Sequence, residues 1–232
     1  MLYGSFELWF TTSVPYRQPP RVARRRAAVR ERLVAEATGI VAAQGWAGAT
    51  VAAVAAATGI STGAVYQHFP NKGALAAEVF RRATQRELEV LATVLAAPTP
   101  ASSADRLAQG VGLFAQRAIL GRQLAYALIA EPADPLVVTE RLAYRRRYHE
   151  VFAALIVEGV RAGEMAQQDP AVTATALTGG VAEVLIGQLS APVDGPAARS
   201  LVAELTALVL RCVGVPATQF APPALEAACP SS

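Results

Sequence analysis

The segment 50–75 contains two short helical patterns separated by a single glycine, Gly59. Glycine enters the left-handed backbone conformation at little cost, so it can end a helix and turn the chain. Ser61 follows as an N-cap residue, because its hydroxyl can accept a hydrogen bond from a free amide in the next helix. Val65 and Phe69 lie four residues apart and form the buried face of that second helix. Two short helices joined by a tight turn that contains glycine predict a helix-turn-helix.

The same segment resembles the DNA-binding signature of the TetR family of transcriptional regulators. The matching residues are Thr50, Val54, Ala55, Gly59, Ile60, Ser61, Gly63, Val65, Tyr66, His68, Phe69, Asn71, Lys72 and Leu75. The resemblance extends back through a helical pattern at residues 24–44, so its specific part covers about a quarter of the 232 residues. Three positions depart from the commonest form of the signature: Thr62 and Ala64 replace longer polar residues, and Gly73 stands where glutamate is frequent. These departures concern the base-reading contacts rather than the fold.

Positive charge is concentrated in the same part of the chain. Residues 1–75 contain eight basic and three acidic residues, a net charge of +5, whereas the whole chain carries +3. The remainder is therefore mildly acidic. A basic head on an acidic body is typical of a nucleic-acid-binding end attached to a second functional unit. The alternative is a solvated basic helix face, which the adjacent helix-turn-helix pattern disfavours.

The second helix of the motif is expected to enter the major groove of DNA, which is wide enough for a helix and presents a distinct pattern for each base pair. With Val65 and Phe69 pointing inward, the residues left to face the duplex are Thr62, Gly63, Tyr66 and Gln67. Gln67 can pair with adenine through two hydrogen bonds, and Thr62 can touch a thymine methyl group.

Lys72 is expected at the start of the next helix, where the helix dipole disfavours a cation by about 0.3–1 kcal/mol. A bound phosphate explains a lysine there, because free backbone amides and the ammonium group converge on it; a tolerated surface charge is the alternative. Thr50 can contact another phosphate, and the resemblance implies the same for Tyr66 and His68. The predicted DNA-contacting residues are Arg24, Arg25, Arg26, Thr50, Ser61, Thr62, Gly63, Tyr66, Gln67, His68 and Lys72.

Helical periodicity continues through the rest of the chain, with no strand-like alternation of useful length. Helices are predicted at residues 24–44, 50–57, 62–69, 72–95, 104–120, 122–130, 137–162, 171–189 and 197–213. The expected fold is all-α, with a three-helix DNA-binding domain at residues 21–70 and a helical effector-binding and dimerisation domain at residues 71–214. Residues 1–20 and 215–232 are expected to be disordered.

The last two predicted helices are apolar on more than one side, and such helices must bury more than one face. A symmetric four-helix interface between two copies meets that need and is the dimerisation mode that the resemblance implies. Burial within one large monomer is the alternative. The predicted interface residues are Leu177, Val181, Val184, Leu201, Leu205 and Leu208.

Aromatic residues of the middle helices are the candidates for ligand contact, namely Phe114, Tyr126, Tyr144 and Tyr148. Such stripes also form ordinary cores, and this alternative stays open. The triplet 145–147 consists of three arginines that cover several helix faces, so at least one is expected to lean toward the body.

Other sequence features argue against a metal-binding or cofactor-dependent protein and against a membrane protein. Two histidines and two cysteines lie scattered along the chain without metal-ligand spacing, so neither a metal nor a cofactor is predicted. The stretch 171–193 contains one charge, Glu183, but its threonines and Gln188 favour a buried helix over a membrane span. A cytoplasmic protein without a membrane partner is expected.

The pattern as a whole predicts a homodimeric regulator that binds double-stranded operator DNA. The resemblance implies a repressor that is released by a small, largely apolar effector of unknown identity. Two alternatives remain: a constitutive DNA-binding protein without an effector, and a helical-bundle enzyme or carrier. The enzyme reading lacks paired carboxylates with metal spacing and lacks a nucleophile beside a base.

Overall fold

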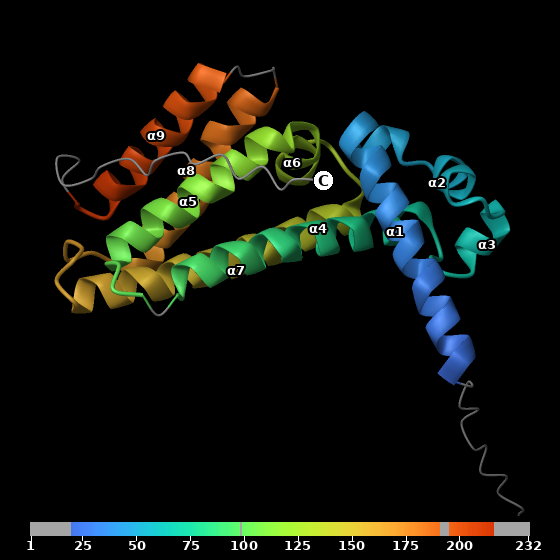
Figure 1. The fold of residues 1–232 in the computed structure, drawn as a ribbon, viewed down its shortest axis with the longest axis horizontal. Coiled ribbons are helices and arrows are strands. Elements are labelled where there is room, and N and C mark those ends of the chain that lie inside the picture. Colours follow the sequence, from blue (N-terminus) through green and yellow to red (C-terminus); the bar gives the residue numbers. More distant parts are fainter. Residues whose placement is uncertain (1–19, 98, 191–194, 216–232) are drawn as a thin grey trace, which may run out of the picture.

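The computed structural model describes residues 20–97, 99–190 and 195–215, and the two predicted extensions lie almost wholly outside these ranges. Every regular element within them is a helix, which confirms the all-α expectation (Figure 1). The helices are α1 (Pro20–Gly48), α2 (Val51–Thr58), α3 (Thr62–Tyr66), α4 (Lys72–Leu95), α5 (Ser103–Leu120), α6 (Arg122–Ile129), α7 (Pro135–Arg161), α8 (Pro170–Leu189) and α9 (Gly195–Cys212).

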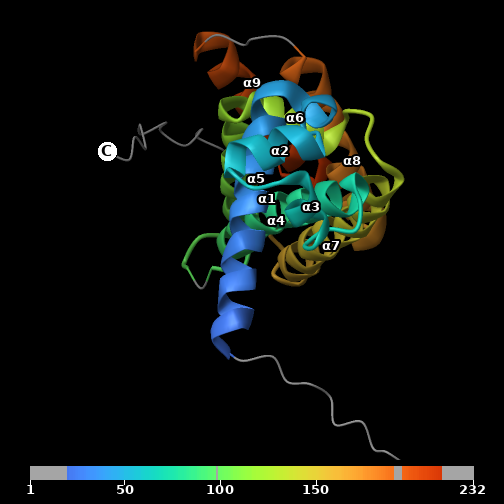
Figure 2. The same cartoon turned by 90° about the vertical axis from the view of Figure 1, so that its right-hand side faces the viewer.

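The first three helices form a small unit at one end of the molecule, with α2 and α3 farthest from the body (Figure 1). Figure 2 shows this unit from the front, with α2 and α3 lying beside α1. Leu33 and Val41 of α1, Val54 of α2 and Val65 of α3 meet in one core and are fully buried. The interhelical angle is therefore set by close packing of branched apolar side chains.

Local chemistry at the helix ends agrees with the sequence expectations. Gly59 ends α2 in the left-handed conformation, with φ of 67°. Ser61 caps α3 through a hydrogen bond from the Ala64 amide to its Oγ (3.2 Å). Asn71 caps α4 in the same way, accepting from the Ala74 amide (2.8 Å). Each cap satisfies an amide that the helix itself leaves free.

Several helix boundaries differ from those predicted, including the start of α1 at Pro20 rather than residue 24 and the start of α7 at Pro135 rather than residue 137. Gly45 leaves the helical conformation, with φ of 68°, but one further turn follows it to Gly48. Helix α3 ends at Tyr66 rather than at residue 69. Phe69 nevertheless stays buried, because its amide still donates to the Val65 carbonyl (3.0 Å) and turns the ring inward.

Helices α4 to α9 form the body, in which α4 packs on α7, α5 packs on α9, and α7 packs on α8. Side chains from all six helices build or border its apolar core. Tyr148 and Val151 on α7 contact both this core and that of the N-terminal unit. The long helix α7 therefore ties the body to the unit that carries α2 and α3.

Helix α8 is long and apolar enough to cross a membrane by length and composition alone. One of its faces, however, is buried in the protein core through Ala174, Leu177, Val181, Leu185 and Leu189. It is a partly buried core helix, as the sequence predicted.

A polar joint connects α1 to α6. The indole Nε1 of Trp46 donates to the carbonyl of Ala127 (2.8 Å), and the Trp46 backbone amide donates to the Glu131 carboxylate (3.1 Å). A side chain at Gly45 would collide with that carboxylate, since an added Cβ would lie 2.5 Å from its Oε1. The first domain is thus seated on the end of α6 at a fixed place.

Candidate nucleic-acid interface and ligand cavity

The exposed face of α3 carries the side chains that were predicted to face DNA. Thr62, Gly63, Tyr66 and Gln67 are all exposed, whereas Val65 is fully buried beneath them. Tyr66 is 52% exposed, which is high for an aromatic side chain. Because α3 ends at Tyr66, Gln67 is the C-cap residue and projects from the last turn of the helix.

Arginines of α1 hold the ends of α2 and α3 from behind. Arg26 donates to the Gln67 carbonyl (2.8 Å), Arg30 donates to the His68 carbonyl (3.1 Å), and Arg32 donates to the Thr58 carbonyl. Cations at helix C-termini are favoured by the helix dipole and satisfy carbonyls that lack an intrahelical partner. Arg26 was predicted to contact DNA, and the bracing of the recognition helix by α1 was not foreseen.

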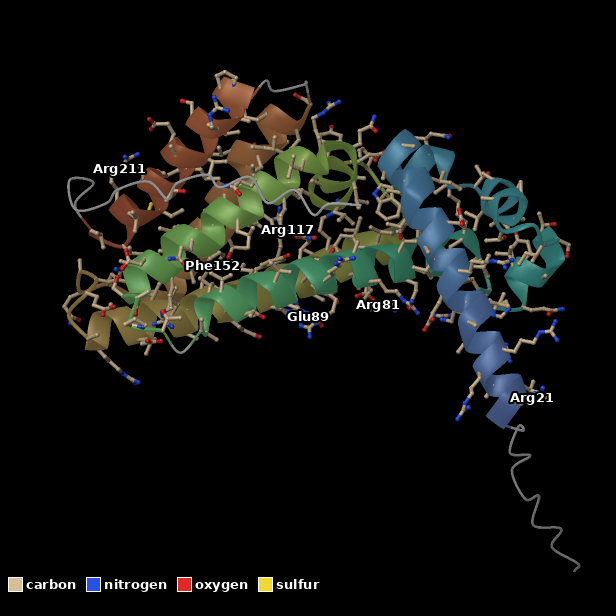
Figure 3. All side chains as sticks on the ribbon, viewed as in Figure 1. Arg21, Arg81, Glu89, Arg117, Phe152 and Arg211 are labelled. Carbon is tan, nitrogen blue, oxygen red and sulfur yellow. The ribbon has the colours of Figure 1, made fainter. Side chains whose placement is uncertain are left out.

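Arg24 and Arg25 lie on the solvent-facing surface of α1. Both are exposed on the first turns of α1, and neither forms a hydrogen bond or an ion pair with any described residue. Figure 3 shows Arg21 on the same turns, at the end of α1 that projects away from the body. Such arginines can supply the salt-dependent, sequence-independent part of DNA affinity.

Lys72 and Thr50 each occupy the helix start that was predicted. Lys72 is the first residue of α4, is exposed, and has no ion-pair partner among the described residues. Thr50 is the N-cap of α2, where its hydroxyl oxygen accepts from the Ala53 amide (3.1 Å). Gly73, which follows Lys72, abuts the Asp134 carboxylate, which would lie 2.6 Å from an added Cβ. A side chain at position 73 would therefore have to displace the Asp134 carboxylate.

His68 lies just beyond the recognition helix, α3, and its side chain is half-buried. Burial lowers the pKa of its imidazole below the usual 6.5, and the neighbouring Arg26 and Arg30 lower it further. The ring is therefore uncharged at neutral pH. A neutral imidazole can still donate one hydrogen bond to a phosphate oxygen.

The body contains a cavity of ≈ 180 Å³ bounded by α4, α5, α6, α7 and α8. Phe114, Tyr144 and Tyr148 line it, as predicted, and the rings of Phe114 and Tyr148 meet edge to face at 5.9 Å. Tyr126 does not line it, and that prediction was wrong. The wall contributed by α6 consists of Leu124, Ala125, Leu128 and Ile129, whereas Tyr126 packs elsewhere on the body core.

Sequence reasoning missed several polar residues at the cavity. Thr84 and Glu87 on α4 lie on one stripe with Phe80 and Leu91, and a threonine within such an apolar stripe was an available signal. Arg117 and Arg141 also line the cavity, as does Arg145, which confirms that one arginine of the triplet leans toward the body. Figure 3 shows Arg117 and Phe152 between α5 and the α4–α7 pair.

Only one of the three arginines that line the cavity forms an ion pair with a described residue. Arg117 and Glu87 form a two-pronged ion pair, with both nitrogen–oxygen distances at 2.7 Å. Arg141 instead donates to backbone carbonyls at the end of α6, namely those of Ala127, Leu128 and Glu131. Burial lowers the pKa of Arg141, Arg145 lowers it further, and Glu131 raises it.

Two protein-family models match the chain. Residues 33–79 match the family of bacterial regulatory proteins named after TetR, and residues 100–185 match the Tetracyclin repressor-like C-terminal domain. The first match covers the helix-turn-helix, and the second covers most of the cavity wall. The chain belongs to the TetR family of transcriptional regulators.

Solved structures share this TetR-family fold. The fatty acid degradation regulator FadR from Bacillus halodurans has a TM-score of 0.68 at 19% identity, covering 78% of this chain and 94% of its own. FadR from Bacillus subtilis in complex with stearoyl-CoA has a TM-score of 0.64 at 16% identity, covering 79% and 97%. RolR in complex with resorcinol has a TM-score of 0.60 at 20% identity, covering 85% and 93%. No curated protein matches the chain.

Membership in the TetR family decides between a transcriptional regulator and a helical-bundle enzyme. The chain is a DNA-binding transcriptional regulator, and the family is not one of enzymes. Among the residues that the structure describes, no group of three or more metal-binding side chains comes together.

Three of the six predicted dimer-interface residues lie inside a single TetR-family protomer. Leu177, Val181 and Leu205 are buried in the body core, so their burial requires no second copy. Val184, Leu201 and Leu208 are only half-buried. The sequence pattern could not separate these sets, because one apolar helix face packs inward and the neighbouring face borders solvent.

Lys72→Ala is expected to weaken binding to all DNA sequences alike and to lower the slope of log affinity against log salt by about 1. The reason is that the exposed ammonium at the start of α4 is placed for one phosphate. Fluorescence anisotropy at several salt concentrations measures the slope. Arg161→Ala, at the far end of the body, serves as the control, and an unchanged slope in Lys72→Ala contradicts the phosphate contact.

Gln67→Ala is expected to relax the preference at one or two base positions and to cost about 1–3 kcal/mol at the preferred base. The side chain projects from the end of the recognition helix, while its own carbonyl is held by Arg26. Selection of bound sequences from random duplexes compares the wild type with the variant. A uniform loss of affinity with the sequence preference intact excludes Gln67 as a base reader.

Proposed function

We propose that this TetR-family regulator is a cytoplasmic homodimeric repressor that a small, largely apolar effector releases from its operator. The observation that carries the proposal is a chain of contacts from the cavity to the DNA-binding unit. Arg141 lines the cavity and donates to the Ala127 carbonyl (3.1 Å). Trp46 of α1 donates to the same carbonyl oxygen (2.8 Å).

Helix α6 is the element through which this coupling runs. One of its faces forms a cavity wall, and Leu124 and Leu128 on that wall also pack on the core of the N-terminal unit. A ligand that displaces α6 therefore moves the carbonyl to which Trp46 donates and, with it, changes the direction of α1. Since α1 arginines hold the ends of α2 and α3, the recognition helix follows.

Ligands held by structural relatives support an effector site in the body. FadR from Bacillus subtilis was solved with stearoyl-CoA, and RolR was solved with resorcinol. The cavity of this chain has mostly apolar walls, which suit a largely apolar molecule.

A dimer is supported by the surface that α8 and α9 leave uncovered. Their outward positions include small residues such as Ala176, Gly179 and Ala203, and nothing lies within 4 Å of an added Cβ at Gly179. Small residues permit close approach of helices from a second copy, and a twofold axis beside α8 and α9 then gives a four-helix interface. Two recognition helices then read half-sites about 34–36 Å apart, or multiples of that distance.

Release from DNA needs only a modest coupling energy. A ligand shifts the equilibrium by its difference in affinity for the DNA-bound and free conformations. A tenfold loss of operator affinity corresponds to about 1.4 kcal/mol, within the usual range for allosteric coupling. A constitutive DNA-binding protein is the second candidate, and it requires this coupling to be zero.

Gly179→Arg is expected to give folded monomers with greatly reduced operator affinity, because a long cation then projects from the centre of the proposed interface. Analytical ultracentrifugation at micromolar concentration measures the association state, and circular dichroism checks the fold. Ala154→Arg, an exposed substitution on α7, is expected to remain dimeric. A monomeric wild type, or a Gly179→Arg variant that stays dimeric, contradicts the proposed interface.

Trp46→Phe is expected to bind operator and effector separately but to lose most of the coupling between them. The substitution keeps an aromatic ring at the joint while removing the indole N–H that reaches α6. Calorimetric titration of an effector, identified by thermal-shift screening, measures its affinity with and without operator. By reciprocity, the operator weakens effector binding by the factor by which the effector weakens operator binding.

Tyr126→Phe is the matched control, because it alters an aromatic residue of α6 itself yet leaves the joint and the cavity wall intact. Coupling is expected to be unchanged in this variant. Equal effector affinity with and without operator in the wild type rejects the repressor mechanism in favour of constitutive binding.

A further inference from the structure

The cavity carries an excess of positive charge. Four charged residues line it, and two of them, Glu87 and Arg117, neutralise each other in their ion pair. Arg141 and Arg145, one turn apart on α7, form no ion pair with any described residue. Arg141 is half-buried and Arg145 is exposed, so the charge extends from the wall toward solvent.

The positive charge of Arg145 disfavours the charged form of Arg141. The pKa of Arg141 is lowered by burial and then by the charge of Arg145, and the opposing effect of Glu131 does not restore it. The Glu131 carboxylate is itself engaged by the Trp46 amide at the joint. An anion bound between the two guanidinium groups offsets this repulsion and supplies the ion-pair partner that neither arginine has among the described residues.

Two hydroxyl groups on the cavity wall also lack partners. Thr84 is 7% exposed, and its Oγ1 has no hydrogen bond within the described part of the protein. A buried hydroxyl without a partner is costly, so natural proteins rarely leave one. Tyr148 likewise forms no hydrogen bond with a described residue, and burial raises the pKa of its phenol, which keeps the group protonated as a donor.

Cavity size limits the ligand to a compact molecule. An apolar cavity of about 150 Å³ in another protein accepts benzene. The volume of ≈ 180 Å³ here therefore accommodates roughly one ring with one or two substituents. The rings of Phe80, Phe114 and Phe152 supply apolar walls for that ring.

We propose that the effector is a compact monocyclic carboxylic acid with a further oxygen substituent. Its carboxylate pairs with Arg145 and Arg141, its ring fills the space among the phenylalanines, and its second oxygen bonds to Thr84 and Tyr148. This inference rests on the proposed effector function and deepens it by naming the chemical class of the ligand.

The test uses benzoate, 3-hydroxybenzoate and 4-hydroxybenzoate as probes, with the corresponding neutral benzamides as matched compounds. Calorimetric titration of the full-length protein at pH 7 is expected to give at least tenfold tighter binding for the acids. Arg145→Gln is expected to abolish this preference. Arg146→Gln is the control, because this neighbour is exposed and does not line the cavity. Absence of binding by all three acids, or a preference that survives Arg145→Gln, overturns the proposal.

Thr84→Val tests the second anchor. Replacing an unpartnered buried hydroxyl with a methyl group of the same shape is expected to raise the melting temperature of the free protein. The same change is expected to weaken the better-bound hydroxybenzoate at least fivefold while benzoate is little affected. A variant that is destabilised, or that weakens both acids equally, shows that Thr84 is not a ligand anchor and overturns that part of the proposal.

Operator binding separates failure of this inference from failure of the proposed function. If a neutral compound releases the operator and no acid binds, the assigned ligand class is wrong while the repressor mechanism stands. If the acids bind with the expected dependence on Arg145 but leave operator affinity unchanged, the site is correct and the proposed regulation is wrong.

Discussion

The seating of Trp46 on the end of α6 is the interaction on which the rest of the structure depends. Its indole N–H reaches a buried carbonyl, and its backbone amide reaches the Glu131 carboxylate. A buried polar group is costly without a partner, so this joint admits little sliding. Gly45 makes the approach possible, because any side chain there collides with the same carboxylate. Together with the apolar contacts of Tyr148 and Val151, this joint holds the N-terminal unit against the body.

The same carbonyl also belongs to the cavity side of the molecule. Arg141 donates to it while lining the cavity, so the DNA-binding unit and the cavity share one hydrogen-bond acceptor. A ligand that attracts this guanidinium competes directly with the bonds that hold the end of α6. Coupling through a shared acceptor needs no long pathway and no large rearrangement. A carboxylate as ligand brings this competition about most simply, since it is the strongest hydrogen-bonding partner that a guanidinium can find.

Local sequence signals predicted the helix-turn-helix because its determinants act over a few residues. A left-handed glycine at Gly59 and hydroxyl or amide caps at Ser61 and Asn71 depend on backbone chemistry that any neighbourhood respects. The end of α3 was misjudged, because Phe69 lies beyond the end of the helix yet stays buried, with its amide still donating to the Val65 carbonyl. The bracing of this unit by α1 arginines joins residues about 40 positions apart, beyond the reach of any local pattern.

By itself, the sequence determined the all-α class, the recognition helix and the exposed residues on it, because caps, glycine turns and 3.6-residue periodicity are local. Only the tertiary structure decided which apolar faces meet within one protomer, burying Leu177 and Leu205, which the sequence had assigned to a partner. It also decided that Thr84 and Arg141 line a cavity while Tyr126 does not. The physical reason is that apolar burial is non-directional. A stripe of apolar residues specifies that a helix face is covered, and only close packing specifies what covers it.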